Sequence, residues 1–221
     1  MLIGLHDTER DHMPSKSFPN LALMKLSAYH KARGSAVEWW NALNNAVYGA
    51  VYSSKVCDFT PENPYLLETS IKGGTGYGLY TELSPEIDGI FPDYSLYPDC
   101  DYAVGYLTRG CPNRCNWCVV PAKEGDIRLY ADWRDIVRSG TKKIVLMDNN
   151  ILASEYGISQ LAELSATDYR IDLNQGMDAR RVTPEIADVL ARVKWLKYIR
   201  FSCDQIPQIN AILTACLCIF W

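Results

Sequence analysis

The second half of the chain alternates short apolar segments with amphipathic ones, and this pattern constrains the fold most. The apolar segments have the length of strands, and the segments between them carry apolar residues at helical spacing. Repeated strand–helix units make the strands parallel, because each crossover returns the chain to the same end of the sheet. We therefore predict an α/β sheet that is open or curves into a partial TIM-type βα barrel. The expected strands are 102–107, 143–147, 169–173 and 197–201, and the expected helices are 132–139, 154–165 and 184–193.

The first 98 residues predict a smaller, Rossmann-like α/β unit. An apolar strand at 2–5 precedes a helix that begins after Asn20, a good N-cap, and ends before Gly34. Two further short strands are expected at 46–51 and 68–71, the second followed by a glycine-rich turn. Strand, helix and strand in this order are typical of an open α/β unit.

We predict three parts in the chain: a first domain with its linker at 1–98, a core at 99–208 and a tail at 209–221. The tail ends in ILTACLCIFW and shows no polar face. A free apolar segment of this kind is hard to solvate, so it either packs across an incomplete sheet or marks a truncated or frameshifted product. We favour truncation.

Charge and hydropathy exclude several classes of protein. The formal net charge is −4, which argues against broad electrostatic binding to nucleic acid or to an anionic membrane. No apolar run approaches the roughly 20 residues that span a bilayer. The first residues place charges directly after a very short apolar stretch, unlike a signal peptide. We expect a cytoplasmic location and no membrane partner.

Three of the eight cysteines lie within eight residues, in the segment GCPNRCNWC. Their spacing is C-x3-C-x2-C, and the segment follows an expected strand, where parallel sheets place ligands. Three thiolates leave one iron of a four-iron cubane open for chemistry. The alternative is a structural zinc knuckle, which needs a fourth ligand. The histidines all lie in the first region, and Cys100 precedes a whole strand, so we favour the cluster.

This cysteine motif, with Trp117 directly before its last cysteine, resembles the radical S-adenosylmethionine (radical SAM) superfamily. The resemblance covers roughly residues 102–205. It implies a [4Fe–4S] cluster on Cys111, Cys115 and Cys118 whose open iron binds the amino and carboxylate groups of S-adenosylmethionine. It also implies an oxidoreductase chemistry in which that molecule is cleaved reductively to methionine and a 5′-deoxyadenosyl radical. Trp117 is carried over as a cofactor-binding position.

The resemblance also suggests cofactor contacts at the ends of the later strands. The superfamily often places a GGE-type motif for the amino group where this chain has Asp148, Asn149 and Asn150. Asp148 could instead cap the following helix. Lys123 and Glu124, behind the cysteines, are expected to be solvated and to shape the loop.

Gln175 and Arg180 follow the third strand of the core. The planar guanidinium of Arg180 could hold the methionine carboxylate, or it could pair with Asp178 at the surface. Asp204 follows the fourth expected strand, where the family often contacts the ribose. The neighbouring Cys203 is expected to be a small buried residue.

The first region is similar in outline to the cobalamin-binding domain that precedes the core in some radical SAM enzymes. The D-x-H-x-x-G element that supplies the axial histidine is missing from this region. The turn GGTGYG has neither the spacing nor the lysine of a phosphate loop, so a tight turn is its simpler interpretation. We therefore expect a scaffold or substrate-binding lid rather than a cobalamin site.

The function expected from the sequence is radical generation on an unassigned substrate, with flavodoxin or ferredoxin as the reductant. One alternative is a methyl- or methylthiotransferase of the same superfamily. Methylthiotransferases usually hold a second cluster on three N-terminal cysteines, and only Cys57 and Cys100 are present here. Another alternative is a truncated remnant that keeps the cluster without turnover.

Overall fold

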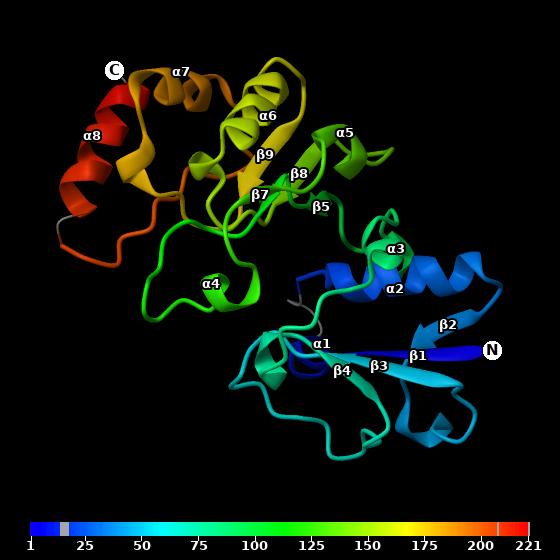
Figure 1. Ribbon diagram of the computed structural model, residues 1–221. Helices are drawn as coiled ribbons and strands as arrows, with labels where there is room; N and C mark the ends of the chain where they lie inside the picture. The colour runs from blue at the N-terminus through cyan, green and yellow to red at the C-terminus, as the bar shows by residue number, and fades with distance from the viewer. Residues whose placement is uncertain (14–17, 207, 221) are drawn as a thin grey trace. The chain divides into compact units, whose positions relative to one another are not determined.

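The computed structural model describes residues 1–13, 18–206 and 208–220. It divides into two compact units, Met1–Cys100 and Asp101–Trp221, each with its own parallel sheet (Figure 1). Pro207 and Trp221, which fall in the predicted core and tail, lie outside the described residues. No helix in the described part of the chain has both the length and the apolar character needed to cross a bilayer.

The first unit holds a four-stranded sheet in the order β2-β1-β3-β4, with all pairs parallel. Ile3 and Leu5 of β1 are fully buried, and α2 lies along one face of the sheet (Figure 1). As predicted, Asn20 caps α2, and its side chain accepts from the backbone N–H of Leu23. The elements are β1 Leu2–Asp7, α1 Thr8–His12, α2 Leu21–Ala32, β2 Ala36–Trp39, η1 Ala42–Asn44, β3 Ala50–Ser54, β4 Ile71–Gly73, η2 Thr75–Tyr77, α3 Pro85–Asp88 and η3 Tyr94–Leu96.

Two strands of this unit start later than predicted, and β2 was missed. The 3-10 turn η1, capped by Asn41, takes up the chain before β3, and pairing resumes where the N–H of Gly49 bonds to the carbonyl of Leu2 at 2.8 Å. β2 is an edge strand of four residues whose side chains are half-buried or exposed. So short an edge strand carries little apolar signal.

The second unit is built on the three-stranded parallel sheet β5-β8-β9. Its core contains fully buried side chains from β8, α6, β9 and α7, among them Ile144, Leu161, Ile171 and Leu190. The elements are β5 Ala103–Gly105, β6 Thr108–Arg109, α4 Val120–Lys123, β7 Arg128–Leu129, α5 Trp133–Ile136, β8 Lys143–Leu146, η4 Ile151–Ala153, α6 Glu155–Ser165, β9 Arg170–Leu173, η5 Ala179–Arg181, α7 Pro184–Arg192 and α8 Gln208–Phe220.

The predicted strand at 197–201 is wrong, because this segment makes one isolated bridge, Met177↔Phe201, and a second bridge, Ile171↔Trp195, lies just before it. Between the bridges, the carbonyl of Leu173 accepts from the guanidinium of Arg200 at 2.9 Å, so a side chain takes the place of a ladder hydrogen bond. The α/β class with parallel strands is confirmed. A closed or TIM-type barrel is not established by three paired strands.

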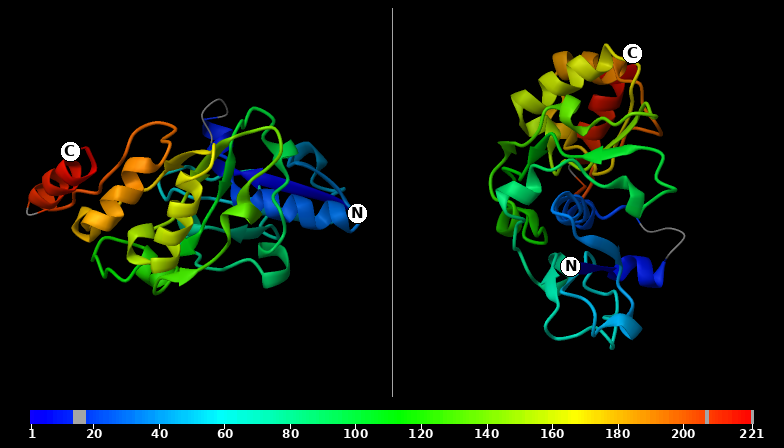
Figure 2. Two further views of the ribbon diagram at one scale, coloured as in Figure 1. Left: turned by 90° about the horizontal axis from the view of Figure 1, so that it is seen from above. Right: turned by 90° about the vertical axis from the view of Figure 1, so that its right-hand side faces the viewer.

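Residues 209–220 of the apolar tail belong to helix α8, which packs beside α7 (Figure 2). Ala215 and Ile219 of α8 are buried, and Ile219 belongs to the core of the unit. Leu213, Leu217 and Phe220 are exposed. The segment therefore divides into a packed face and an exposed apolar face.

Candidate iron–sulfur site

The cysteine loop, defined here as residues 110–119, joins β6 to α4 beyond the carboxyl end of β5 (Figure 1). Its base requires glycine: Gly110 has a φ of +85°, and a Cβ there would lie 2.3 Å from the carbonyl oxygen of Asp126. The N–H of Cys111 then bonds to the carbonyl of Gly125 at 3.1 Å. The two ends of the loop are thereby held together.

A buried ion pair supports the same base. Glu124 accepts two hydrogen bonds from the guanidinium of Arg109, at 2.7 and 2.6 Å. The guanidinium also lies 4.4 Å from the ring centre of Tyr106 and 5.3 Å from that of Tyr130. Glu124 is 8% exposed, so the expectation that its charge is solvated was wrong. A lone Glu in a loop gives no signal of an arginine fifteen residues earlier, and only the β6–β7 hairpin brings the two together.

The end of β8 contacts the chain that leads into the loop. Asp148 accepts from the backbone N–H groups of Leu107 and Thr108, at 3.1 and 2.6 Å, and from the Thr108 hydroxyl at 2.7 Å. Burial raises the pKa of Asp148 to about 6, although these hydrogen bonds favour its charged form. Asn149 accepts from the N–H of Gly110 at 3.0 Å, and the amide of Asn150 donates to Sγ of Cys111 at 3.4 Å.

The chain after β9 contacts the other side of the loop. Asp178 accepts from the amide of Asn113 at 3.0 Å and from the guanidinium of Arg180 at 2.7 and 2.8 Å. Burial alone would raise the pKa of Asp178, but the hydrogen bonds from Arg180 and Asn113 outweigh it and lower the pKa. The Asp178–Arg180 pair considered from the sequence therefore forms. It joins the loop through Asn113, which the sequence did not single out.

The remaining predicted residues lie at the surface. Trp117 is 62% exposed, and Gln175 and Asp204 are also exposed. Cys203 is exposed rather than buried, which corrects the expectation of a small core residue. The structure thus brings Asn149 and Asn150 into direct contact with the cysteine loop, Asp148 into contact with the chain just before the loop, and Arg180 to the loop through Asp178.

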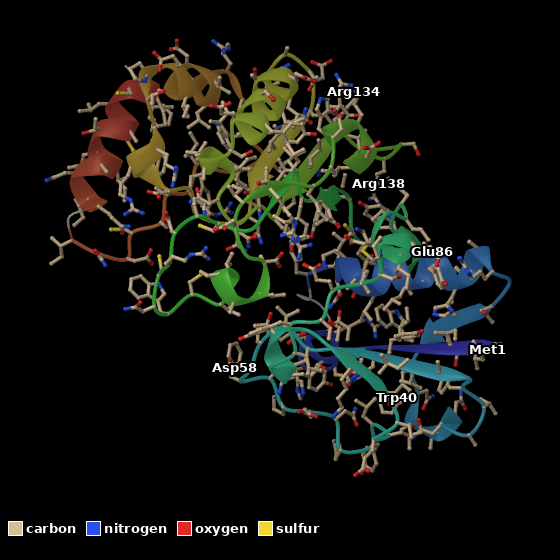
Figure 3. The ribbon with its side chains drawn as sticks, in the orientation of Figure 1. Met1, Trp40, Asp58, Glu86, Arg134 and Arg138 are labelled. Atoms are coloured by element: carbon tan, nitrogen blue, oxygen red, sulfur yellow. The ribbon has the colours of Figure 1, made fainter. Side chains whose placement is uncertain are left out.

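The loop suits an iron–sulfur cluster in its donor chemistry. Figure 3 shows sulfur atoms along the loop, and the three cysteines are free thiols with intermediate exposure. A buried amide directed at Cys111 matches the N–H···S hydrogen bonds that accompany cluster ligands. Among the described residues, no three Cys, His, Asp or Glu side chains are gathered closely enough to hold a metal ion. The three thiols therefore fit a cluster by their chemistry. The cysteine loop would have to bring them together around it.

The histidines are committed to contacts in the first unit. His6 bonds to Ser53 and Asp11, His12 to the carbonyl of Pro61 and His30 to the hydroxyl of Tyr52. Figure 3 labels Trp40, whose ring meets His6 edge-on with the centroids 5.1 Å apart. Each of the three histidines of the chain therefore has a hydrogen-bond partner in the first unit.

Comparison with known proteins finds partial similarity to methylthiotransferases. The chain is 32% identical over 80 residues to the ribosomal protein uS12 methylthiotransferase RimO of Thermus thermophilus, covering 34% of this chain and 18% of that protein. It is 24% identical over 138 residues to RimO of Hahella chejuensis, covering 54% and 29%. For RimO of Brucella canis the identity is 28% over 80 residues. No family model matches the chain.

The matched part spans less than a third of these relatives' length. This partial similarity and the cysteine loop at the end of a parallel strand agree with the resemblance to the radical SAM superfamily drawn from the sequence.

Proposed function

We propose that this chain is an iron–sulfur enzyme of the radical SAM type. It would bind a [4Fe–4S] cluster through Cys111, Cys115 and Cys118 and cleave S-adenosylmethionine reductively. The observation that carries the proposal is a three-thiol loop held by buried side chains at the carboxyl end of a parallel sheet. Three ligands for four irons leave one position open to a small molecule.

When bound, the cluster would supply the electron that divides S-adenosylmethionine into methionine and a 5′-deoxyadenosyl radical. The residues of the chain have three tasks around it. The three thiolates hold the iron, and the β6–β7 hairpin with its Arg109–Glu124 pair keeps the loop base in place. The third task, holding the sulfonium against the cluster, is proposed for residues on the β9 side of the loop.

For S-adenosylmethionine we propose contacts on the β9 side of the loop. Arg180 is half exposed, and Asp178 fixes the plane of its guanidinium, so it is suited to a carboxylate such as that of the methionine moiety. Asp204 is proposed for the ribose hydroxyls, and Trp117 and Gln175 for further contacts with the same molecule. We propose flavodoxin or ferredoxin as the electron donor.

Anaerobic reconstitution with iron and sulfide tests the proposal. Protein with S-adenosylmethionine and dithionite should release 5′-deoxyadenosine, measured by chromatography, and air should bleach its brown colour because one iron is accessible. Arg180→Ala, compared with Arg192→Ala at the end of α7, should raise the concentration of S-adenosylmethionine needed for half-maximal release. Iron-loaded protein that releases no 5′-deoxyadenosine would leave only a cluster-binding remnant without turnover.

The comparisons favour one second candidate, a methylthiotransferase, because that is the activity in the relatives' names. The cysteine content weighs against a second cluster, since the first unit offers only Cys57 and, at its end, Cys100. The iron content separates the two candidates. About four irons per chain indicate a single cluster, and about eight indicate two.

A further inference from the structure

The three residues after β8, Asp148, Asn149 and Asn150, follow the approach to the cysteine loop step by step. β5 and β8 pair in parallel with Gly105 opposite Leu146, and the N–H of Met147 makes the last ladder bond to Gly105, at 2.9 Å. Beyond that point side chains continue the pairing. The carboxylate of Asp148 accepts hydrogen bonds from the N–H groups of Leu107 and Thr108. The side-chain oxygen of Asn149 accepts from the N–H of Gly110, and the amide of Asn150 donates to the sulfur of Cys111.

Burial makes these contacts specific. Asp148 and Asn150 are each 5% exposed, so water does not compete for their hydrogen bonds. The register set by β5 and β8 directs successive side chains to successive positions of the neighbouring segment. These contacts therefore fix the position of the loop base and of Cys111, the first of the three cysteines.

Asn150 shows a feature that packing alone does not explain. Its amide nitrogen donates to Cys111, while its Oδ1 atom is buried and has no hydrogen-bond partner among the described residues. A buried amide with an unmatched oxygen is unfavourable compared with an apolar side chain of similar shape. The contact that distinguishes Asn150 is the N–H···S bond, and such bonds to cluster sulfurs help to set reduction potentials.

We propose that the Asp148–Asn150 triplet is the support of the cysteine loop and that Asn150 is a positioning residue for Cys111. Its N–H···S bond withdraws charge from the Cys111 thiolate and thereby raises the reduction potential of the bound cluster. This inference rests on the proposed function for the presence of a cluster. It assigns Asn149 and Asn150 to the protein's own loop rather than to S-adenosylmethionine.

The test compares two neighbouring asparagines that hold the same loop by different atoms. Asn150→Ala removes the bond to sulfur, whereas Asn149→Ala removes a bond to the backbone N–H of Gly110. The reconstituted proteins are titrated anaerobically, and electron paramagnetic resonance gives the midpoint potential. Asn150→Ala should shift the potential to a more negative value, and by more than Asn149→Ala, because the Asn149 bond reaches the backbone of Gly110 and not the sulfur.

Asn150→Asp keeps the size of the side chain and replaces the donor by a carboxylate, so it covers the case in which Asn150→Ala fails to fold. Its shift should be negative and larger, because a negative charge then faces the thiolate. Equal potentials in wild type and both Asn150 variants would overturn the inference alone. An iron-loaded wild type that releases no 5′-deoxyadenosine would overturn the proposed function alone, and a wild type that takes up no iron would overturn both.

Discussion

The two parallel sheets use their carboxyl ends in opposite ways. In the first unit, polar side chains there bond to one another: His6 joins Asp11 at 2.9 Å and Ser53 at 2.7 Å, and Ser53 joins the hydroxyl of Tyr77 at 2.7 Å. In the second unit, Asp148 and its neighbours bond to the approach and base of a loop instead.

The two sheets share a parallel topology, but only the second one directs its polar side chains toward a candidate functional loop. Parallel sheets place ligand sites at the carboxyl ends of their strands, and both sheets of this chain collect polar groups there. His6 and Ser53 are each 2% exposed and satisfy one another, so that edge is a closed network. The edge of the second sheet directs its hydrogen bonds to a loop with three thiols, and we expect perturbations of the two edges to have different consequences.

The largest effect should come from removing one thiol of the loop. Cys115→Ala should abolish the brown chromophore of reconstituted protein, because two thiolates do not hold a four-iron cluster. Cys203→Ala is the matched control, since this cysteine is exposed and lies outside the loop. Absorbance and iron analysis measure the result, and a full four-iron spectrum in Cys115→Ala would contradict the ligand assignment.

Gly110→Ala should destabilise the second unit by about 3 to 5 kcal/mol, since a positive φ combines with a Cβ contact no side chain tolerates. Gly34 in the first unit has a φ of +77° but nothing within 4 Å of a built Cβ. Gly34→Ala should therefore cost only about 1 kcal/mol. Denaturant unfolding of both variants gives the comparison, and equal losses would show that the loop base is not tightly packed.

The pH dependence of stability should report on Asp148. Its pKa is about 6 in the folded protein against an ordinary value of 3.8, so the folded state binds more protons between these values. The stability that protonated Asp148 contributes is complete below pH 3.8 and is lost as the pH rises through 6. Relative to Asp148→Asn, the wild type should lose up to about 3 kcal/mol between pH 4 and 7.

Denaturant unfolding at several pH values measures this difference. The counterpart in the first unit is Asp7, whose pKa burial also raises and whose carboxylate accepts from Tyr97 at 2.5 Å. Asp7→Asn should likewise weaken the loss of stability with rising pH, because the raised pKa of Asp7 acts in the same direction, and it should have no effect on iron binding. Parallel pH curves for wild type and Asp148→Asn would contradict the raised pKa.

The smallest effect is expected from Ser53→Ala. This change leaves buried His6 without one of its partners and should cost about 1 to 2 kcal/mol of stability. Iron content after reconstitution should equal that of the wild type, because the hydrogen-bond partners of Ser53 are His6 and Tyr77 and neither belongs to the cysteine loop. If Ser53→Ala bound less iron at unchanged stability, the carboxyl end of the first sheet would also affect the cluster, which contradicts the comparison.

Local patterns in the sequence were sufficient for the longer helices and the central strands. The helix after Asn20 and the helix after Ser154 both begin where a capping residue was available, and Pro184 opens the helix it was expected to open. The strands at 143–146 and 170–173 follow from short apolar runs. The segment 197–201 failed as a strand because the Leu173 carbonyl takes a side-chain donor from Arg200, and periodicity carries no information about such a contact.

In the candidate site, too, some features were predicted from the sequence and others were seen only in the structure. The cysteine spacing and its place after a strand were visible in the sequence, and so was the choice between an Asp178–Arg180 pair and a ligand contact. The roles of Asn113 and Glu124 were not visible. Their partners lie across a hairpin or at the start of η5, and no spacing rule links them.

What the sequence alone determined is therefore whatever depends on neighbours within a few residues: the α/β class, the helix caps and a set of three thiols with one spacing. Tertiary structure decided which polar groups meet. The partners of Asp148 and Asn150 are 39 to 41 residues away along the chain, and the register of β5 against β8 brings them into contact. Register comes from packing of the whole sheet, so the support of the cysteine loop appears only when the chain is folded.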